Sequence, residues 1–389
     1  MIDRSEEQHD VIRAEVGRLC DKYGNEYWRS LEPNRYPEEF VAELSKQGWL
    51  GALIPEEFGG GNLSLGGASV ILEEISARGG NPSACHAQMY VMGTVLRHGS
   101  DAQKKNYLPR IADGRSRLQA FAVTEPEAGS NTTMIRTRAE RDGEIYRING
   151  QKIWTSRAEY SDLMVLLART TPVDQVEDRL EGLSVFLLEM RNEDGSLVPG
   201  LTINPIETMM NHNTTEVFFD DVEIPVEALI GLEGQGFRQI LDGMNAERIL
   251  IAAECIGDGR FFLDRASAYA REREVFGRPI GQNQGVQFPL ARAHIQVEAA
   301  DLMRWRAADL FDSGVSCGVE ANMAKYLASE ASWAAGNAAL DTHGGFGFAA
   351  EYDIERKLRE TRLYQVAPIS NNLILAFVGQ KCLDLPKSY

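Results

Sequence analysis

The chain has 389 residues, 43% of them hydrophobic, and a formal net charge of −17. This length suits two or three domains with hydrophobic cores of their own. The acidic balance, without any basic stripe, argues against a nucleic-acid partner and against docking on an anionic membrane.

The numbers and positions of the cysteines and histidines narrow the class of protein further. The five cysteines are odd in number and scattered, and the six histidines lie far apart. We therefore expect neither a disulfide framework nor a metal centre. The N-terminal stretch Met1–Glu7 is acidic, and no apolar run reaches about 18 residues, so the sequence predicts no leader and no spanning helix. These features together predict a cytoplasmic protein.

Residues 1–118 carry apolar side chains at helical spacing and predict an N-terminal α-helical domain. Good helices are expected over 65–77 and 82–98. The second of these has Met89 and Met92 on one stripe. Ordinary core packing and an acyl-chain pocket lined by adaptable thioethers are both open for this stripe.

Residues 119–231 change to a two-residue period, which is typical of strands. We expect a middle all-β domain of barrel or sandwich type. The charged segment 171–181 is most simply a surface loop. The clearest strands are predicted over 144–148, 163–168, 183–188 and 216–219.

Residues 232–389 return to a helical period and predict a C-terminal four-helix-bundle domain. The glycine-rich segment 231–237 lacks the third glycine of a dinucleotide fingerprint and is interpreted as a hinge. Long helices are expected over 239–273, 286–312 and 318–342. The fold class is therefore α+β, with a β domain inserted between two helical ones.

Two motifs in the middle region look suited to a ligand. The stretch 121–130, Phe-Ala-Val-Thr-Glu-Pro-Glu-Ala-Gly-Ser, predicts a short strand that breaks at Pro126 and turns at Gly129. The stretch 149–156, Asn-Gly-Gln-Lys-Ile-Trp-Thr-Ser, supplies Trp154, whose apolar face could cover a flat heteroaromatic ring. Either stretch alone is ordinary turn chemistry.

The two motifs in this order resemble the flavin-binding signature of the acyl-CoA dehydrogenase family. The resemblance extends over nearly the whole chain, from about residue 3 to 385, and includes the helix–β–helix layout. It implies FAD as cofactor. The middle-domain residues that it assigns to the flavin are Phe121, Val123, Thr124, Gly129, Ser130, Trp154, Thr155 and Ser156.

A third motif, Arg-Glu-Val-Phe-Gly-Arg-Pro-Ile at 273–280, lies between two predicted long helices. By itself it could be a surface loop with an ion pair. It is similar to a family motif in which Arg273, Phe276 and Gln284 would reach the flavin of a neighbouring subunit. The resemblance therefore implies a homo-oligomer, with a tetramer expected.

Two further segments match family positions near the flavin. The segment 342–348 ends a predicted helix in glycines, and the resemblance assigns Gly344 and Gly345 to the flavin pyrophosphate. Asp341 stands where the family usually has Gln, and an acid would repel that group. Ser370 and Asn372 match positions that approach the flavin adenine, in a loop that has diverged.

The helix over 239–257 carries a carboxylate on its apolar face. Helical spacing places Glu247 among Ile240, Met244, Leu250 and Ile251. Burial on such a face would raise the pKa of the carboxyl group toward the range useful for a general base. A glutamate that caps or pairs locally is the structural alternative.

The family places its proton-abstracting glutamate either in a late loop or on this helix in a Glu-Arg pair. In this chain Pro368 and Ile369 occupy the places of the loop acid and its glycine. Glu247 and Arg248 match the helix alternative, found in isovaleryl-like and long-chain-like members, and are predicted to be catalytic; Glu254 is the second candidate. Pro368 also lacks the N–H that the family uses at the thioester carbonyl.

The resemblance implies α,β-dehydrogenation of an acyl-CoA thioester to the trans-2-enoyl-CoA. Glu247 would remove the α-proton while hydride leaves the β-carbon for the flavin, and electrons would pass to electron-transfer flavoprotein. Two alternative functions stay open. One is a divergent flavoenzyme acting as an oxidase, a monooxygenase or in an elimination, and the other is a non-catalytic acyl-CoA-binding flavoprotein. Acyl chain length and branching are not readable from the sequence.

Overall fold

A computed structural model describes residues 4–387 of the chain. Residues 1–3, part of the acidic stretch from which no leader was predicted, and residues 388–389 lie outside it. The chain forms two compact units. Unit one contains the residues up to Glu32, Leu63–Pro82 and those from Asn245 onward, and unit two contains Pro33–Asn62 and Ser83–Met244. The predicted three-part division at 118 and 231 stays a prediction.

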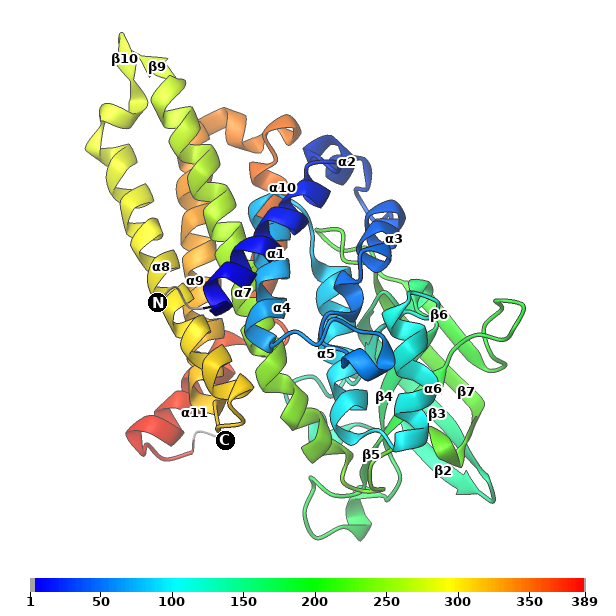
Figure 1. The fold of residues 1–389 in the computed structure, drawn as a ribbon. Coiled ribbons are helices and arrows are strands. Elements are labelled where there is room, and N and C mark those ends of the chain that lie inside the picture. The colour runs from blue at the N-terminus through cyan, green and yellow to red at the C-terminus, as the bar shows by residue number, and fades with distance from the viewer. Residues whose placement is uncertain (1–3, 388–389) are drawn as a thin grey trace. The chain divides into compact units, whose positions relative to one another are not determined.

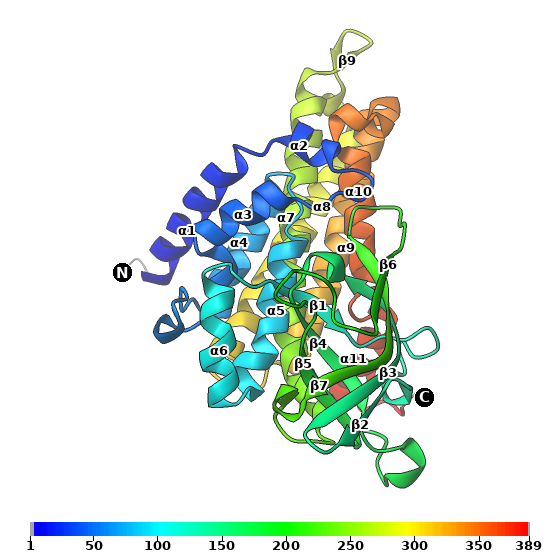
Figure 2. The ribbon, with the colours of Figure 1, turned by 90° about the vertical axis from the view of Figure 1, so that its right-hand side faces the viewer.

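Unit two combines three helices with one large sheet (Figure 2). Its helices are α3 (Glu38–Lys46), α5 (Ser83–His98) and α6 (Asp101–Ala112). The hydrogen-bonded order of the sheet is β6-β7-β3-β2-β4-β5-β8, and β1 pairs in parallel with β4. The strands are β1 (Leu118–Ala122), β2 (Arg138–Asp142), β3 (Ile145–Ser156), β4 (Leu163–Arg169), β5 (Leu183–Glu189), β6 (Leu201–Pro205), β7 (Thr214–Pro225) and β8 (Leu229–Ile230).

The middle strands are buried on both faces. All seven residues of β4 are buried, and they alternate between two cores. Leu163, Val165 and Leu167 belong to the core that includes residues of α5 and α6, whereas Met164 and Leu166 belong to a second core with residues of β3 and β7. Within the described residues β6 and β8 end the strand order without pairing to each other, so the sheet is sandwich-like and does not close into the barrel that was the other option.

Unit one is helical. Its elements are α1 (Arg4–Cys20), α2 (Asn25–Ser30), α4 (Leu65–Ala77), α7 (Gly236–Glu272) from Asn245 onward, α8 (Gln284–Asp312), α9 (Gly318–His343), α10 (Ile354–Arg362) and α11 (Asn371–Leu383). A two-stranded ribbon, β9 (Glu274–Val275) and β10 (Arg278–Pro279), joins α7 to α8. Figure 1 shows α7, α8 and α9 running side by side. The predicted long helices are confirmed with shifts of a few residues at their ends.

Helix α4 is held to α8 by polar contacts at both ends. The Asp312 carboxylate accepts from the backbone N–H groups of Leu65 and Gly66 at 2.8 and 3.0 Å. Toward the C-terminal end of α4, the buried carboxylate of Glu73 pairs with Arg304 of α8 at 2.8 Å and with Arg13 of α1 at 2.7 Å. A buried carboxylate is stable only when paired in this way, so these contacts fix α4 against the long helices.

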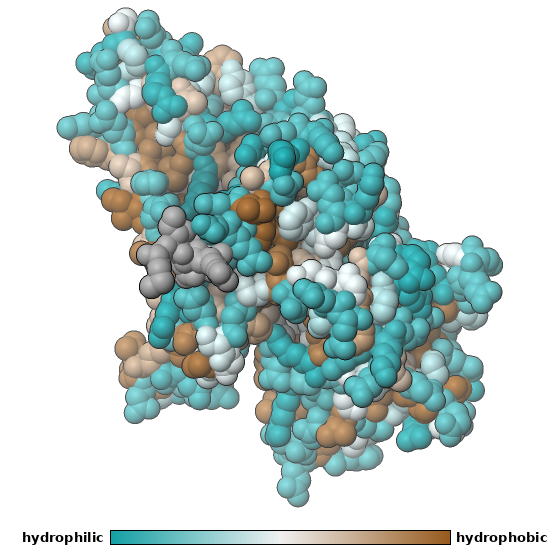
Figure 3. All heavy atoms as spheres, viewed as in Figure 1, coloured by the Kyte–Doolittle hydropathy of each residue, from teal (hydrophilic) through white to brown (hydrophobic). Residues whose placement is uncertain are grey.

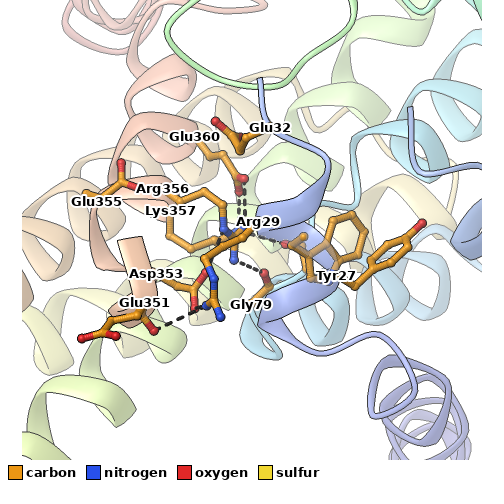
Figure 4. Close-up of polar contacts among 12 residues, drawn as sticks. Tyr27, Arg29, Glu32, Gly79, Glu351, Asp353, Glu355, Arg356, Lys357 and Glu360 are labelled. Carbon is orange, nitrogen blue, oxygen red and sulfur yellow. Dashed lines mark hydrogen bonds and ion pairs between the residues drawn. The ribbon is translucent and has the colours of Figure 1, made fainter. Parts of the chain in front are cut away.

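A second buried charge network positions α10. The Lys357 ammonium contacts Asp258 at 2.7 Å, Glu360 at 2.8 Å and the Gly80 carbonyl at 3.0 Å. These three contacts match its three donors. Figure 4 shows how Arg29 reaches Asp353 and the Glu351 carbonyl from α2. The network therefore fixes the helix from which the chain enters the diverged loop before α11.

Candidate active site

The turn after β1 is tied to β3, so the two flavin-signature motifs meet in unit two. Strand β1 ends at Ala122, earlier than the predicted break at Pro126. Beyond it, the Ile153 N–H donates to the Thr124 carbonyl at 2.9 Å. The buried Lys152 ammonium donates to the Val123 carbonyl and to Glu125, both at 2.9 Å.

Glu125 organises the inside of this turn. Its carboxylate also accepts from the backbone N–H groups of Arg136 at 2.6 Å and Thr137 at 2.8 Å. Burial works against its charged form, but the Lys152 charge and these hydrogen bonds hold the pKa of Glu125 below its ordinary value. The ionised pair lies beneath the turn, while Gly129 and Ser130 above it are exposed.

Trp154 sits on a β-bulge. The pairing of β3 with β7 shifts register between Ile153 and Thr155, and Trp154 is the extra residue, with φ of +62°. A bulge re-aims the side chain of its extra residue, and a non-glycine residue in this region is uncommon. The indole is accordingly 57% exposed, and Trp154 is the one exposed residue of β3. An exposed flat apolar face results, next to the turn that carries Thr124.

The other predicted flavin residues of unit two fall into two groups. Thr124 and Ser156 are partly exposed and can reach a ligand. Phe121 and Val123 are partly buried and pack against the core beside α5. Thr155 is buried, and its hydroxyl makes no hydrogen bond within the described part of the chain.

This arrangement fits a flavin. An exposed indole offers a flat stacking surface, and Ser156 and Thr124 offer hydroxyl groups beside it. At Gly129 an added Cβ would come no closer than 4.0 Å to Thr124, so the turn backbone is open to a ligand. FAD, when bound, supplies the two-electron acceptor of the reaction.

Unit one brings together the other two predicted cofactor segments. The Arg273 guanidinium lies 5.9 Å from the ring centroid of Phe346, in the turn that follows Gly344 and Gly345. Phe276 is fully exposed at the tip of the β9–β10 ribbon, and Gln284 at the start of α8 is also exposed. These residues form an accessible polar and aromatic edge at one end of the long helices.

The diverged loop places its predicted residues differently. Ser370 caps α11, because its hydroxyl accepts from the Leu373 N–H at 3.3 Å. Asn372 is exposed, as are Gly344 and Asp341 at the end of α9. A contact of Ser370, Asn372 and Gly344 with the flavin stays a prediction, as does the repulsion of the pyrophosphate by Asp341.

Glu247 is buried on α7, as its helical position predicts. It is 6% exposed, and the face it shares includes the buried side chains of Leu250 and Ile251. Its neighbour Arg248 is 9% exposed and donates to the Asn245 amide oxygen at 2.9 Å. Burial lowers the pKa of Arg248, and the Glu247 carboxylate opposes that shift. The two side chains are therefore electrostatically coupled inside unit one.

Glu254, the second candidate, has a local partner. It is 1% exposed and accepts a 2.5 Å hydrogen bond from the Tyr364 hydroxyl. Burial first, and then the Glu254 charge, raise the pKa of Tyr364 well above its ordinary value, so the tyrosine stays a donor. One oxygen of the Glu254 carboxylate is therefore already engaged with a side chain of the same unit.

The loop at 366–370, to which the resemblance assigns an acid in other members, is held by Lys325 on α9. This ammonium is buried and donates to the Ile369 carbonyl at 2.7 Å and to the Asn371 amide oxygen at 2.9 Å. Burial lowers the pKa of Lys325 to about 8, and nearby charges, Glu247 among them, act on it. Pro368 is exposed, so this loop presents no carboxylate.

Comparisons with known proteins match these features. Family models for the N-terminal, middle and C-terminal domains of acyl-CoA dehydrogenase match residues 6–115, 120–222 and 234–380. The chain belongs to the acyl-CoA dehydrogenase family. It is an oxidoreductase of this type, and FAD is the cofactor of the family.

Individual relatives cover the chain almost completely. It is 39% identical to the acyl-CoA dehydrogenase FadE12 of Mycobacterium tuberculosis, with 98% of each chain covered. It is 33% identical to the glutaryl-CoA dehydrogenase of Desulfococcus multivorans, covering 98% of this chain and 96% of the relative. The solved FAD complex of PigA superimposes with a TM-score of 0.89, 25% identity and 98% coverage of each chain.

Sequence reasoning missed two residues near the acyl-CoA dehydrogenase motifs. Arg157 directly follows the Trp154 motif and is buried, with φ of +60°. Lys325 is a buried lysine in the middle of a helix otherwise rich in alanine. A charged residue at a position that the helical period assigns to the core was the available signal for Lys325. Arg157 gave no such signal.

Proposed function

We propose that the protein dehydrogenates an acyl-CoA thioester between its α and β carbons with Glu247 as the base. One observation carries this proposal. A buried carboxylate stands beside Arg248 on α7, whereas the loop position that the resemblance assigns to the alternative base holds the exposed Pro368. A positioned base of this kind contributes about 10²–10⁴-fold to the rate.

The residues of the chain have separate tasks in this reaction. Glu247 accepts the α-proton at its carboxylate. Arg248 keeps a positive charge beside that carboxylate and orients it. The buried surroundings of both exclude water, which strengthens their electrostatic interaction. Trp154 and Ser156 hold the ring of the cofactor in unit two, and Pro368, which has no N–H, leaves the thioester carbonyl to other donors.

The product on this proposal is the trans-2-enoyl-CoA, and an electron-transfer flavoprotein takes the electrons. The family membership supports both, and FadE12, the relative at 39% identity, carries the acyl-CoA dehydrogenase name. We further propose a cytoplasmic location, consistent with the reduced thiols of the described cysteines. The division into domains at 118 and 231 is likewise kept as a proposal.

Assembly with further copies of the chain is the third part of the proposal. Phe288, Ile295 and Leu302 repeat every seven residues along α8 and are 55%, 68% and 74% exposed. Figure 3 shows apolar side chains at the left edge of the view, where α8 lies in Figure 1. Such a seam fits a helix of a second copy. We propose a tetramer in which Arg273 and Gln284 serve the cofactor of a neighbour.

The decisive experiment is anaerobic addition of acyl-CoA thioesters to the purified protein while the flavin absorption band is followed. Bleaching of the band with release of enoyl-CoA supports the dehydrogenase. Bleaching that admitted oxygen rapidly reverses with release of hydrogen peroxide, or that yields another product, indicates a divergent flavoenzyme. A protein that binds thioesters but never bleaches is a non-catalytic flavoprotein, and a colourless protein that takes up no FAD refutes the proposal.

A further inference from the structure

A cluster of basic side chains lies in unit two directly behind the Trp154 motif. Arg157 is 3% exposed and follows Ser156 at the turn into the short helix Ala158–Tyr160. His86 on α5 is 6% exposed. His212 lies in the segment that leads into β7. None of these three residues has a part in the proposed dehydrogenation steps.

Backbone contacts bring the three segments together. The Arg157 N–H donates to the Asn213 carbonyl at 2.7 Å, which places His212 next to this turn. The Arg157 side chain donates from Nε to the Ser83 carbonyl at 3.2 Å. Ser83 opens α5, and His86 follows it by one helical turn on the same face.

An aromatic path connects this cluster to a predicted flavin residue. The His86 ring meets the Tyr90 ring edge-on, with 5.1 Å between centroids. Tyr90 in turn meets Phe121 of β1 at 5.4 Å. The cluster therefore lies along the α5 face that ends beside the cofactor motif, and this is the helix whose methionine stripe suggested an acyl-chain pocket.

The electrostatics of the cluster favour an anion. Burial lowers the pKa of His212 well below its ordinary value, and the charges of Arg157 and His86 lower it further. The Arg157 guanidinium is positively charged, and a negative group beside it could also accept from the ring N–H groups of the two histidines. A guanidinium offers five N–H donors in a planar fork that suits the two oxygens of a carboxylate.

We infer that Arg157, His86 and His212 form a binding site for a carboxylate at the far end of the acyl chain. The substrate class is then an acyl-CoA thioester of a dicarboxylic acid, not one with a methyl end. This inference rests on the proposed function and adds specificity to it. The competing explanation is that Arg157 only anchors the start of α5 to the end of β3.

Pairs of thioesters with equal carbon number separate these explanations. Glutaryl-CoA is compared with valeryl-CoA, and adipyl-CoA with hexanoyl-CoA, by anaerobic flavin reduction with the wild-type holoenzyme. We expect kcat/KM for the carboxylate member of at least one pair to exceed that for the methyl member by ~10-fold or more, since a charge-assisted hydrogen bond is worth about that much. A wild-type preference below three-fold, or one for the methyl member, in both pairs overturns the inference.

Variants test which residues cause the preference for the thioester with a terminal carboxylate. In Arg157→Gln the preference should fall at least ten-fold, and in Arg157→Lys, which keeps the charge, part of it should remain. His86→Leu tests the same site without touching the backbone anchor and should lower the preference if Arg157→Gln fails to fold. An unchanged preference in folded variants overturns the assignment.

A binding measurement keeps this inference distinct from the dehydrogenase proposal. If no thioester bleaches the flavin, the proposed function fails, and calorimetric titration then decides the inference. Glutaryl-CoA or adipyl-CoA binding ~10-fold more tightly than its methyl partner supports the site. Equal binding within both pairs refutes it.

Discussion

Replacing Glu247 with Gln tests the mechanism most directly. Glutamine keeps the size of the side chain and removes the proton acceptor, so the packing around this buried position is preserved. Flavin reduction under anaerobic single-turnover conditions should slow by ~10²–10⁴-fold, which corresponds to about 2.7–5.5 kcal/mol in the barrier. FAD content and thioester affinity should stay close to wild type.

The same variant should also lose stability by a predictable amount. Arg248 is 9% exposed, and burial lowers its pKa while the Glu247 charge opposes the shift. Breaking a buried ion pair costs ~3–5 kcal/mol, and removing the favourable charge interaction of Glu247 with Arg248 should cost less. Because Asn245 still accepts a hydrogen bond from Arg248 at 2.9 Å, we expect a smaller loss of ~1–3 kcal/mol in the free energy of unfolding, measured by denaturant titration.

Glu254→Gln is the matched control, since it makes the same chemical change on the same helix. The Tyr364 hydroxyl can still donate to the amide oxygen of the new side chain, so the fold should persist and reduction should stay within about ten-fold of wild type. Wild-type reduction by Glu247→Gln, together with loss of reduction in Glu254→Gln, would transfer the role of base to Glu254 and refute the assignment.

Three further predictions concern the cofactor edge and the buried charges of unit one. Arg273→Ala should weaken FAD retention by about ten-fold, the contribution of a charge-assisted hydrogen bond, whereas the control variant Arg271→Ala, at an exposed position, should retain FAD like the wild type. Dialysis followed by absorption spectroscopy measures the FAD content of both variants. Equal retention by the two would contradict the role of Arg273. Burial lowers the pKa of Lys325 from 10.5 to about 8, so the unfolded chain binds more protons between these pH values. The stability of the wild type relative to Lys325→Met should therefore rise as pH increases from about 8 to 10.5 and fall as pH drops through 8. A stability difference that does not change with pH would contradict the shift. Glu73→Gln leaves the fully buried Arg304 without its carboxylate partner on α4 and should lower the free energy of unfolding, measured by denaturant titration, by ~3–5 kcal/mol. A loss below about 1 kcal/mol would show that Asp301 alone holds Arg304.

Local patterns predicted most of the elements. The helix over 65–77 has the predicted bounds, and the predicted strand 163–168 is one residue shorter than β4. The apolar face around Glu247 was also correct, because a 3.6-residue period fixes which side chains share a face. In these cases the signal lies within a single window of sequence.

Features that depend on a partner remote in sequence could not be predicted. The bulge at Trp154 arises from register with β7, some 60 residues further on, and nothing within the Trp154 motif specifies it. In the sequence Glu73 is an ordinary polar residue of a predicted helix, yet its side chain is fully buried, because it forms an ion pair with Arg304 of α8. Strand β1 stops at Ala122 because Lys152 takes the carbonyl of Val123.

Lys325 shows why a site can change while its scaffold persists. Its ammonium donates to the backbone carbonyl of Ile369 and to the side-chain amide oxygen of Asn371, and neither contact involves the side chain at position 368. Tyr364, earlier in the same segment, is anchored independently to Glu254 on α7. With both ends fixed, the loop tolerates Pro368 in place of an acid without loss of its path. If Glu247 is the base, as proposed, it needs no support from that loop, because its side chain is buried among residues of its own helix face.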